Sequence, residues 1–502
     1  MCLPVTLGTS TTPKQAETSA TSRNKVDLMD HQLKSRRTRI LARSAAAALA
    51  VPLIAGLAPD AMAAGPATLT GSLPDGATYL IQVPETWNGA LVLYSHGIVI
   101  PGSPNPARDV GDPLTGQYLL DHGYALVGSS YATTGWAVQD GLADQIATLD
   151  VFSSLVGHPS RTIAWGHSLG GLITAGLIQR YPDRFAGALP MCGPVAGSVG
   201  TWNQALDAEV VFQQLMAPPG PLQLVHITDP ALNLQIAQQT LTVAQATPAG
   251  RARVALSAAL ADVPGWFTPG SPEPAPADYD TQENNQFRWE AQVGLPSAFA
   301  GRADVEARAG GNPSWNTGVN YQRELESSAD YTEVQELYAE AGLSLAADLA
   351  TLQAAPPIAA DPAAVGYLTR NIALDGQLGG RPVLTLHTTG DGWVVNQNEQ
   401  AYRSAVQNAK DAQLLRQAFV HRAGHCTFTP AETIAAFQTL IDRIDHGAWT
   451  GSIDPGALND RASALGPSLN VLRIGTNVVP MAPAFLGFEP SPFPRPFDLA
   501  SQ

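Results

Sequence analysis

The stretch RTIAWGHSLGGLITAGLIQRY, residues 161–181, contains the pattern that decides the fold. Residues 161–166 are typical of a short buried strand, and residues 169–181 are typical of a helix. Between them residues 166–170, GHSLG, form a G-x-S-x-G pattern. A serine at such a strand-to-helix turn exposes its hydroxyl at the carboxyl edge of a sheet. We therefore predict that Ser168 is a nucleophile; the alternative is an ordinary turn, because a lone G-x-S-x-G also occurs by chance.

Strand and helix patterns alternate on both sides of this stretch. Strands are predicted over residues 78–83, 90–94, 124–130, 161–166, 187–191, 382–387 and 414–420, and helices over 117–122, 138–156, 169–181 and 430–446. This alternation predicts βαβ units and a mostly parallel sheet that is covered by helices on both faces. The fold class is therefore α/β.

A long segment with helical periodicity, rich in Ala, Gln and Pro, interrupts the alternation after the strand at 187–191. We interpret it as a helical cap or lid inserted into the sheet-forming domain. The predicted organisation is an N-terminal extension and signal peptide (1–63), the first part of the core (64–196), the helical cap (197–375), the second part of the core (376–446) and a Pro-rich C-terminal tail (447–502). We expect the tail to lie extended over the surface.

The N-terminal region has the pattern of a secretory signal. Basic residues between Lys34 and Arg43 precede an apolar run, residues 44–57, and the small-x-small sequence AMA follows at 61–63. We expect cleavage near Ala63 and a secreted product. The alternative is a membrane anchor, but the run is short for a bilayer span, and we expect no stable membrane anchor.

A serine hydroxyl is a weak nucleophile and needs a base, which a third group orients. For a nucleophile at such a turn the expected chain order is Ser, then Asp or Glu, then His. His425 is the preferred base because it lies in a loop just after the last predicted strand. His421, at the end of that strand, is its rival. Asp391, on a turn directly after the strand at 382–387, is the preferred acid, although an Asp beside Gly can also be a simple turn former.

Two backbone N–H groups should stabilise the oxyanion that forms on the attacked carbonyl. The first is that of Leu169, directly after the nucleophile, and the second is that of Ile98, in the sequence SHGI after an early strand. Trp136 also follows a strand, and we predict that it forms a wall of the substrate pocket. Four aromatic residues of the insertion, Trp266, Phe267, Trp289 and Trp315, are candidates for an apolar cap surface, with core packing as the alternative.

These motifs together resemble the α/β-hydrolase fold family. His96-Gly97, the turn at Ser168, Asp391 and His425 occur in that family's order, over residues 67–195 and 380–446. The insertion occupies the usual place of the family's cap. The resemblance implies an exported serine hydrolase similar to esterases and lipases, and a serine nucleophile is unlike the aspartate of the dehalogenases and epoxide hydrolases of this fold.

Cys192 and Cys426 remain after removal of the signal segment, and two cysteines in an exported protein commonly form a disulfide. Cys192 ends the strand after the nucleophile helix, and Cys426 follows His425, so both should lie at the carboxyl edge of the sheet. We predict a bond that tethers the histidine loop. The alternative is two separately buried thiols.

The composition narrows the function further. The net charge of −15 argues against nucleic-acid binding, and the sequence shows neither a metal-ligand cluster nor a nucleotide-binding loop, so no cofactor is expected. We predict a carboxylic-ester hydrolase that acts on a small-molecule or polymeric ester through an acyl-enzyme. The alternatives are an exported serine peptidase of the prolyl aminopeptidase type, an acyltransferase, and a non-catalytic binding protein on the same scaffold.

Overall fold

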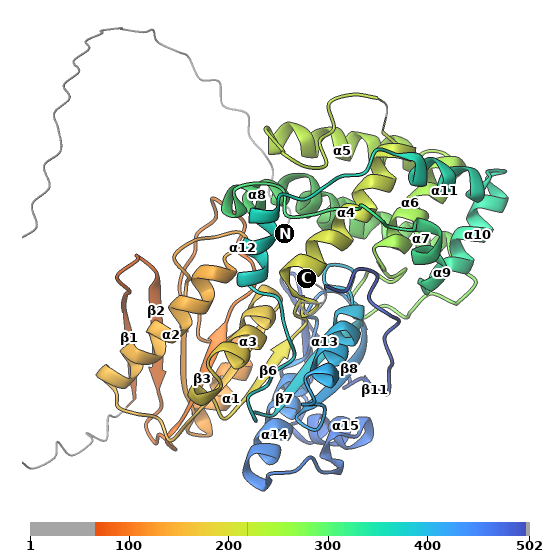
Figure 1. Ribbon diagram of the computed structural model, residues 1–502. Helices are drawn as coiled ribbons and strands as arrows, with labels where there is room; N and C mark the ends of the chain where they lie inside the picture. The colour runs from red at the N-terminus through yellow and green to blue at the C-terminus, as the bar shows by residue number, and fades with distance from the viewer. Residues whose placement is uncertain (1–65, 218, 498–502) are drawn as a thin grey trace, which may run out of the picture. The chain divides into compact units, whose positions relative to one another are not determined.

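A nine-stranded mixed sheet organises this computed structural model, which describes residues 66–217 and 219–497 (Figure 1). The strand order is β1-β2-β4-β3-β5-β6-β7-β8-β11. The strands are β1 Ala67–Ser72, β2 Thr78–Val83, β3 Ala90–Ser95, β4 Ala125–Ser129, β5 Arg161–His167, β6 Gly187–Met191, β7 Val383–Gly390, β8 Leu415–Ala423 and β11 Phe485–Leu486. Strands β3 to β8 are parallel, and β1, β2 and β11 pair antiparallel at the two edges. The predicted signal segment, residues 1–63, lies outside the described residues.

Helices cover both faces of the sheet, which confirms the predicted α/β fold class. One face packs on α2 Val138–Leu155, α3 Leu169–Arg180 and α13 Gln397–Asn408, and the other on α1 Pro113–Asp121, α14 Pro430–His446 and α15 Pro455–Ala464. The six residues of β3 are all buried. Its Leu91 and Leu93 enter the first core, whereas Val92 and Tyr94 enter the second. A strand buried on both faces reads as a continuous apolar run, which is why this pattern was visible in the sequence.

The described residues between β6 and β7 form helices. They are α4 Gly197–Leu215, α5 Pro230–Gln245, α6 Pro248–Leu260, α7 Tyr279–Trp289, two π-helical segments at Glu290–Gly294 and Ser297–Gly301, α8 Arg302–Ala309, α9 Tyr321–Ser327, α10 Tyr331–Glu340, α11 Leu345–Ala354 and α12 Pro362–Arg370. Figure 1 shows most of them gathered at one end of the sheet. They enclose an apolar core of their own, with α6 in contact with α4, α5, α7 and α10.

The C-terminal segment contains more structure than the extended tail that the sequence suggests. Besides α15, it forms a small antiparallel pair, β9 Val471–Ile474 with β10 Asn477–Pro480. Strand β11 then pairs with β8 and forms the edge of the sheet, and Phe485 is buried in the core under α14 and α15. The contacts of β11 and Phe485 are made with a distant part of the chain, so the local Pro-rich composition does not show them.

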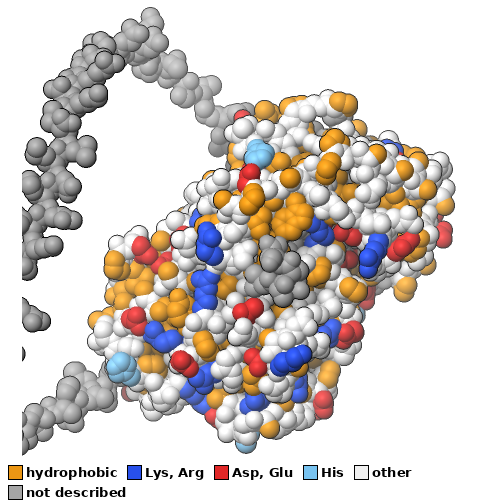
Figure 2. Space-filling model, viewed as in Figure 1, with side chains coloured by type: hydrophobic (Ala, Val, Ile, Leu, Met, Phe, Trp, Pro, Cys, Tyr) orange, Lys and Arg blue, Asp and Glu red, His pale blue; other side chains and the backbone are white. Residues whose placement is uncertain are grey.

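The surface and the helices carry two further findings. On the face drawn in Figure 2, acidic and basic side chains of the described residues are scattered among one another rather than gathered by sign. Within residues 66–217 and 219–497, no helix combines the length and the apolar character that a bilayer crossing requires.

Candidate active site

Ser168 lies at the turn from β5 into α3, with a backbone conformation that side chains other than glycine rarely adopt. Its φ is 58° and its ψ is −128°, and its N–H donates to the carbonyl of Met191 at 2.9 Å. A Cβ atom added at Gly170 would lie 2.0 Å from the carbonyl oxygen of Ser95, the last residue of β3. The glycine therefore lets β3 approach the start of α3, and the turn holds the Ser168 hydroxyl clear of the sheet.

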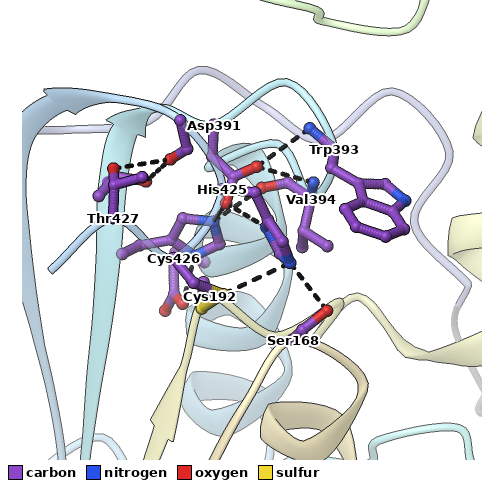
Figure 3. Close-up of a disulfide and its surroundings, with 12 residues drawn as sticks. Ser168, Cys192, Asp391, Trp393, Val394, His425, Cys426 and Thr427 are labelled. Atoms are coloured by element: carbon purple, nitrogen blue, oxygen red, sulfur yellow. Dashed lines mark hydrogen bonds and ion pairs between the residues drawn. A yellow bond between two sulfur atoms is a disulfide. The ribbon is translucent and has the colours of Figure 1, made fainter. Parts of the chain in front are cut away.

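A continuous chain of hydrogen bonds joins Ser168 to the two residues predicted as its partners (Figure 3). The Nε2 atom of His425 lies 2.8 Å from Ser168 Oγ, and its Nδ1 atom lies 2.7 Å from Asp391 Oδ2. The three residues follow β5, β7 and β8, and the carboxyl ends of these parallel strands meet at the same edge of the sheet. The fold thereby brings together side chains that are up to 257 positions apart in the sequence.

The carboxyl group of Asp391 is fully buried and accepts hydrogen bonds at both oxygens. Its Oδ1 atom accepts the N–H groups of Trp393 and Val394, each at 3.0 Å. Burial alone raises the pKa of this carboxyl, but the neighbouring His425 and His387 outweigh burial and lower the pKa to about 2. Asp391 is therefore ionised at neutral pH, as a group that orients a histidine must be.

The rival base, His421, is not brought to Ser168. Its Nδ1 atom lies 3.4 Å from Thr389 Oγ1, its Nε2 atom lies 3.5 Å from a Glu273 oxygen, and its ring packs on Trp266. The side chain is also 44% exposed. This environment is that of a surface histidine at the end of a strand.

The loop that carries His425 is anchored on both sides. Before it, the buried Arg422 forms an ion pair with Glu432 on α14 at 2.6 Å and donates to the Thr427 carbonyl at 2.8 Å. After it, Thr429 begins α14 with a capping box, in which its side chain and that of Glu432 satisfy each other's backbone N–H groups. The side chain of Glu432 thus connects the end of β8, the loop and the helix.

The predicted disulfide between Cys192 and Cys426 is present in the structure (Figure 3). It joins the end of β6 to the residue after His425, across a sequence separation of 234. The Cys426 sulfur lies 3.4 Å from His425 Nε2. Although these three residues lie close enough together to suggest a metal site, the two sulfurs are bonded to each other and offer no thiolate ligand.

The two predicted oxyanion donors line the same cavity as Ser168. Leu169 is the first residue of α3, and the first N–H groups of a helix have no partner within it. The N–H of Ile98 donates to no other described residue. The preceding His96 is buried, stacks on Tyr131 and contacts the Ser130 carbonyl at 3.0 Å through Nε2, so it holds this loop in place.

The cavity beside Ser168 has a volume of about 200 Å³ and a mostly apolar lining. Trp136 forms part of its wall and packs edge-on against Trp202 at 5.4 Å. The backbone N–H of Trp136 donates to the carboxyl group of Asp304 on α8 at 2.8 Å, which ties this wall to the helical region. Phe212, Phe299, Trp202 and Trp393 complete the aromatic lining, and sequence analysis singled out none of these four.

The four aromatic residues proposed for a cap surface pack elsewhere. Trp289 packs against Phe267 at 4.8 Å and donates to the Trp266 carbonyl, and Trp315 packs near Phe497 at 6.2 Å. None of them is among the described residues that line the cavity. A helical pattern alone does not distinguish an aromatic residue on the cavity wall from one in the core beneath it.

The charged side chains that line the cavity are acidic. Glu209 is paired with Arg302 at 2.7 Å, and Asp304 is paired with Arg308 at 2.9 Å. Glu290, in the first π-helical segment, is buried and forms no hydrogen bond or ion pair with its side chain within the described ranges; burial raises its pKa to about 7. Because no Lys, Arg or His is among the described lining residues, the lining favours an uncharged or cationic ligand over an anionic one.

Comparison with known proteins identifies the family. No family model matches the chain. Two solved structures from Aspergillus oryzae are distantly similar to this chain. One is an esterase, with 13% identity and a TM-score of 0.40 over 83% of each chain. The other is feruloyl esterase B, with 12% identity and a TM-score of 0.37 over 76% of this chain and 81% of that one. The o-phthalyl amidase of Xanthobacter agilis is 31% identical over 427 residues, which cover 78% of this chain and 90% of the relative. This chain is therefore a hydrolase of the α/β-hydrolase fold, and it belongs to the same family as the o-phthalyl amidase of Xanthobacter agilis.

Proposed function

We propose that this hydrolase cleaves carboxylic esters through an acyl-enzyme formed on Ser168. The observation that carries the proposal is the unbroken hydrogen-bond chain from Ser168 through His425 to the buried Asp391, at the wall of an apolar cavity. An aromatic acyl group suits this cavity, because an apolar cavity of roughly 150 Å³ is large enough for a benzene ring. The predicted signal segment and the disulfide support export, since disulfides persist in oxidising compartments.

The first half of the reaction forms the acyl-enzyme. Ser168 Oγ attacks the acyl carbon while its proton passes to His425 Nε2, and the carbonyl electron pair moves onto the oxygen. Asp391 stabilises the resulting imidazolium. The N–H groups of Leu169 and Ile98 bind the oxyanion, and each such donor lowers the barrier by about 3 kcal/mol. The intermediate then collapses, and the leaving alcohol takes the proton from His425.

The second half releases the acid. A water molecule gives a proton to His425 Nε2 and attacks the acyl carbon of the acyl-enzyme. The second tetrahedral intermediate expels Ser168 Oγ, which recovers the proton from His425. The enzyme returns to its starting state without a cofactor in either step.

Amide cleavage is a second candidate, because the curated relative is named as an amidase. The same groups serve both reactions, but an amine leaves only after protonation, so His425 has to donate its proton before the carbon–nitrogen bond breaks. An ester that shares the acyl group should still react faster, because its leaving group is better.

A matched pair of chromogenic substrates tests the proposal. The mature chain should hydrolyse p-nitrophenyl benzoate, and N-benzoyl-p-nitroaniline should report amide cleavage. A fluorophosphonate probe should label the wild-type protein, whereas Ser168→Ala should show neither labelling nor turnover. Turnover by Ser168→Ala would show that Ser168 is not the nucleophile. A faster reaction with the amide than with the ester would favour amide cleavage.

A further inference from the structure

His387 on β7 lies directly behind Asp391 and is fully buried. Its Nε2 atom contacts the Val394 carbonyl oxygen at 2.8 Å and lies 3.6 Å from Asp391 Oδ2. Its Nδ1 atom lies 3.0 Å from Glu399 Oε1, on α13. The imidazole ring therefore lies between two buried carboxyl groups, one of which belongs to the proposed catalytic triad.

The hydrogen bonds around the ring determine its charge. A carbonyl oxygen only accepts, so the Nε2 atom that faces Val394 carries a proton. Glu399 receives donors at its other oxygen as well, from Thr385 Oγ1 at 2.5 Å and from the Gln417 amide at 2.6 Å. These two donors stabilise the ionised form of Glu399, and an ionised carboxyl group only accepts hydrogen bonds, so the Nδ1 atom that faces Oε1 carries a proton too. With both nitrogens protonated, His387 is an imidazolium cation.

Among the described residues, the charged groups that act on His387 are two carboxylates. Asp391 comes from the turn after β7, and Glu399 comes from α13. Strand β8 places Phe419 opposite His387, and the nearby Tyr402 stays uncharged because burial raises its pKa. Burial alone lowers the pKa of His387, but the two carboxylates outweigh burial and raise it to about 10.

We propose that His387 is a positioning residue, a permanently protonated histidine that, together with Glu399, holds Asp391 ionised and oriented behind His425. This proposal rests on the proposed function of Ser168, His425 and Asp391. To accept the proton of Ser168, His425 must be in its neutral form, and in that form it offers the buried carboxylate a hydrogen bond but no full charge. His387 supplies that charge throughout the cycle, and Glu399 balances it when His425 becomes cationic.

The pH dependence of kcat/KM distinguishes this role from simple core packing. Loss of a nearby cation favours the imidazolium form of His425, so His387→Gln should move the acidic limb of the profile to higher pH. For charges roughly 6 Å apart at an effective dielectric constant of about 20, the shift is about 2 pH units. The double variant His387→Gln/Glu399→Gln removes one charge of each sign and should return the limb towards its wild-type position. The matched control, His226→Gln in the helical region, should leave it in place.

The alternative makes a different prediction for the same variants. If His387 is a neutral core residue, His387→Gln removes no charge, and the acidic limb of the kcat/KM profile stays where it is. The double variant then removes only the Glu399 anion and shifts this limb to lower pH. That pattern would overturn the proposal.

A second measurement reads the charge directly and does not depend on turnover. In the full chain carrying Ser168→Ala and ¹⁵N-labelled histidine, NMR should show both ring nitrogens of His387 protonated at about pH 8.5, well above the ordinary histidine pKa of ~6.5. The signals are assigned by their loss in His387→Gln. A deprotonated ring nitrogen at that pH would overturn the proposal even if the enzyme hydrolyses esters. Conversely, a protonated ring in a protein without hydrolase activity would leave the charge assignment intact and reject the proposed function.

Discussion

Replacing Asp391 by asparagine tests the proposed triad most directly, because it removes a charge while preserving the size of the side chain. The N–H groups of Trp393 and Val394 need an acceptor, so the amide oxygen should take the position of Oδ1. The amide nitrogen then faces His425 Nδ1, at the site of the 2.7 Å contact. Because that nitrogen donates, it forces the histidine proton onto Nε2, where His425 can no longer accept the proton of Ser168.

The size of the effect follows from this change of tautomer. Loss of the correct tautomer in a Ser-His-Asp triad lowers kcat by about ten-thousand-fold, which corresponds to ~5.5 kcal/mol of barrier. Initial rates with p-nitrophenyl benzoate, normalised to folded protein, measure it. Asp375→Asn is the control, because the carboxyl group of Asp375 accepts hydrogen bonds from the neighbouring Gln377 in an exposed turn. Its activity should stay within about twofold of wild type. If Asp391→Asn kept most of the wild-type kcat, Asp391 would not orient His425.

The same substitution should change the dependence of stability on pH. The pKa of Asp391 is about 2 in the folded protein, below its ordinary value of 3.8. A lowered pKa contributes stability above the ordinary value, and that stability is lost as the pH falls through the folded value; here it amounts to ~2 kcal/mol. Urea unfolding at neutral pH and at about pH 2.5 should show a larger loss in wild type than in Asp391→Asn. Equal losses in both proteins would show that the carboxyl is not stabilised in its ionised form.

Three further predictions concern the base, the disulfide and the cavity. His425→Ala should abolish ester hydrolysis, whereas His421→Ala, at a half-exposed position, should stay within about twofold of wild type; equal damage by both would contradict the choice of base. Reduction of Cys192–Cys426, which closes a loop of 234 positions, should lower the free energy of unfolding by up to about 5 kcal/mol and reduce kcat, measured by urea titration and initial rates with and without reductant. An unchanged kcat after verified reduction would show that the bond does not position the histidine loop. The cavity is lined by acidic groups, Glu290 among them, and should disfavour an anionic substrate. The p-nitrophenyl ester of 4-methylbenzoate should therefore have a higher kcat/KM than the mono-p-nitrophenyl ester of terephthalate, which carries a carboxylate in place of the methyl group. The reverse order would contradict the acidic character of the cavity.

Local patterns account for what could be predicted of the fold. The strand ranges around β2, β3, β5 and β6 agree with the structure because each is a continuous apolar run bounded by turn residues. Strand β1, an edge strand with alternating exposure, and α13, which is rich in polar residues, were missed because neither produces an apolar run. The edge strand β11 has two residues, too few for any pattern.

The residues of the candidate site, too, were predicted only in part. Ser168, Asp391 and His425 were recognisable because each stands next to a strand end and the three occur in the expected chain order. His387 lies inside a predicted strand, where no local motif marks it, and only the fold shows that this strand places its ring between Asp391 and Glu399. The aromatic lining was missed because Trp202, Phe212 and Phe299 have no neighbouring motif.

From the sequence by itself we could predict the turn at Ser168, the order of its candidate partners, the α/β fold class and a disulfide between the two cysteines. Each of these depends on residues that are close together in the chain, or on parallel strands that end at a common edge. Only the tertiary structure decided the shape and charge of the cavity, the surroundings of Asp391 and the path of the C-terminal segment. These depend on contacts such as the hydrogen bond from the backbone N–H of Trp136 to Asp304, 168 positions apart. No local pattern encodes which distant groups will meet in space.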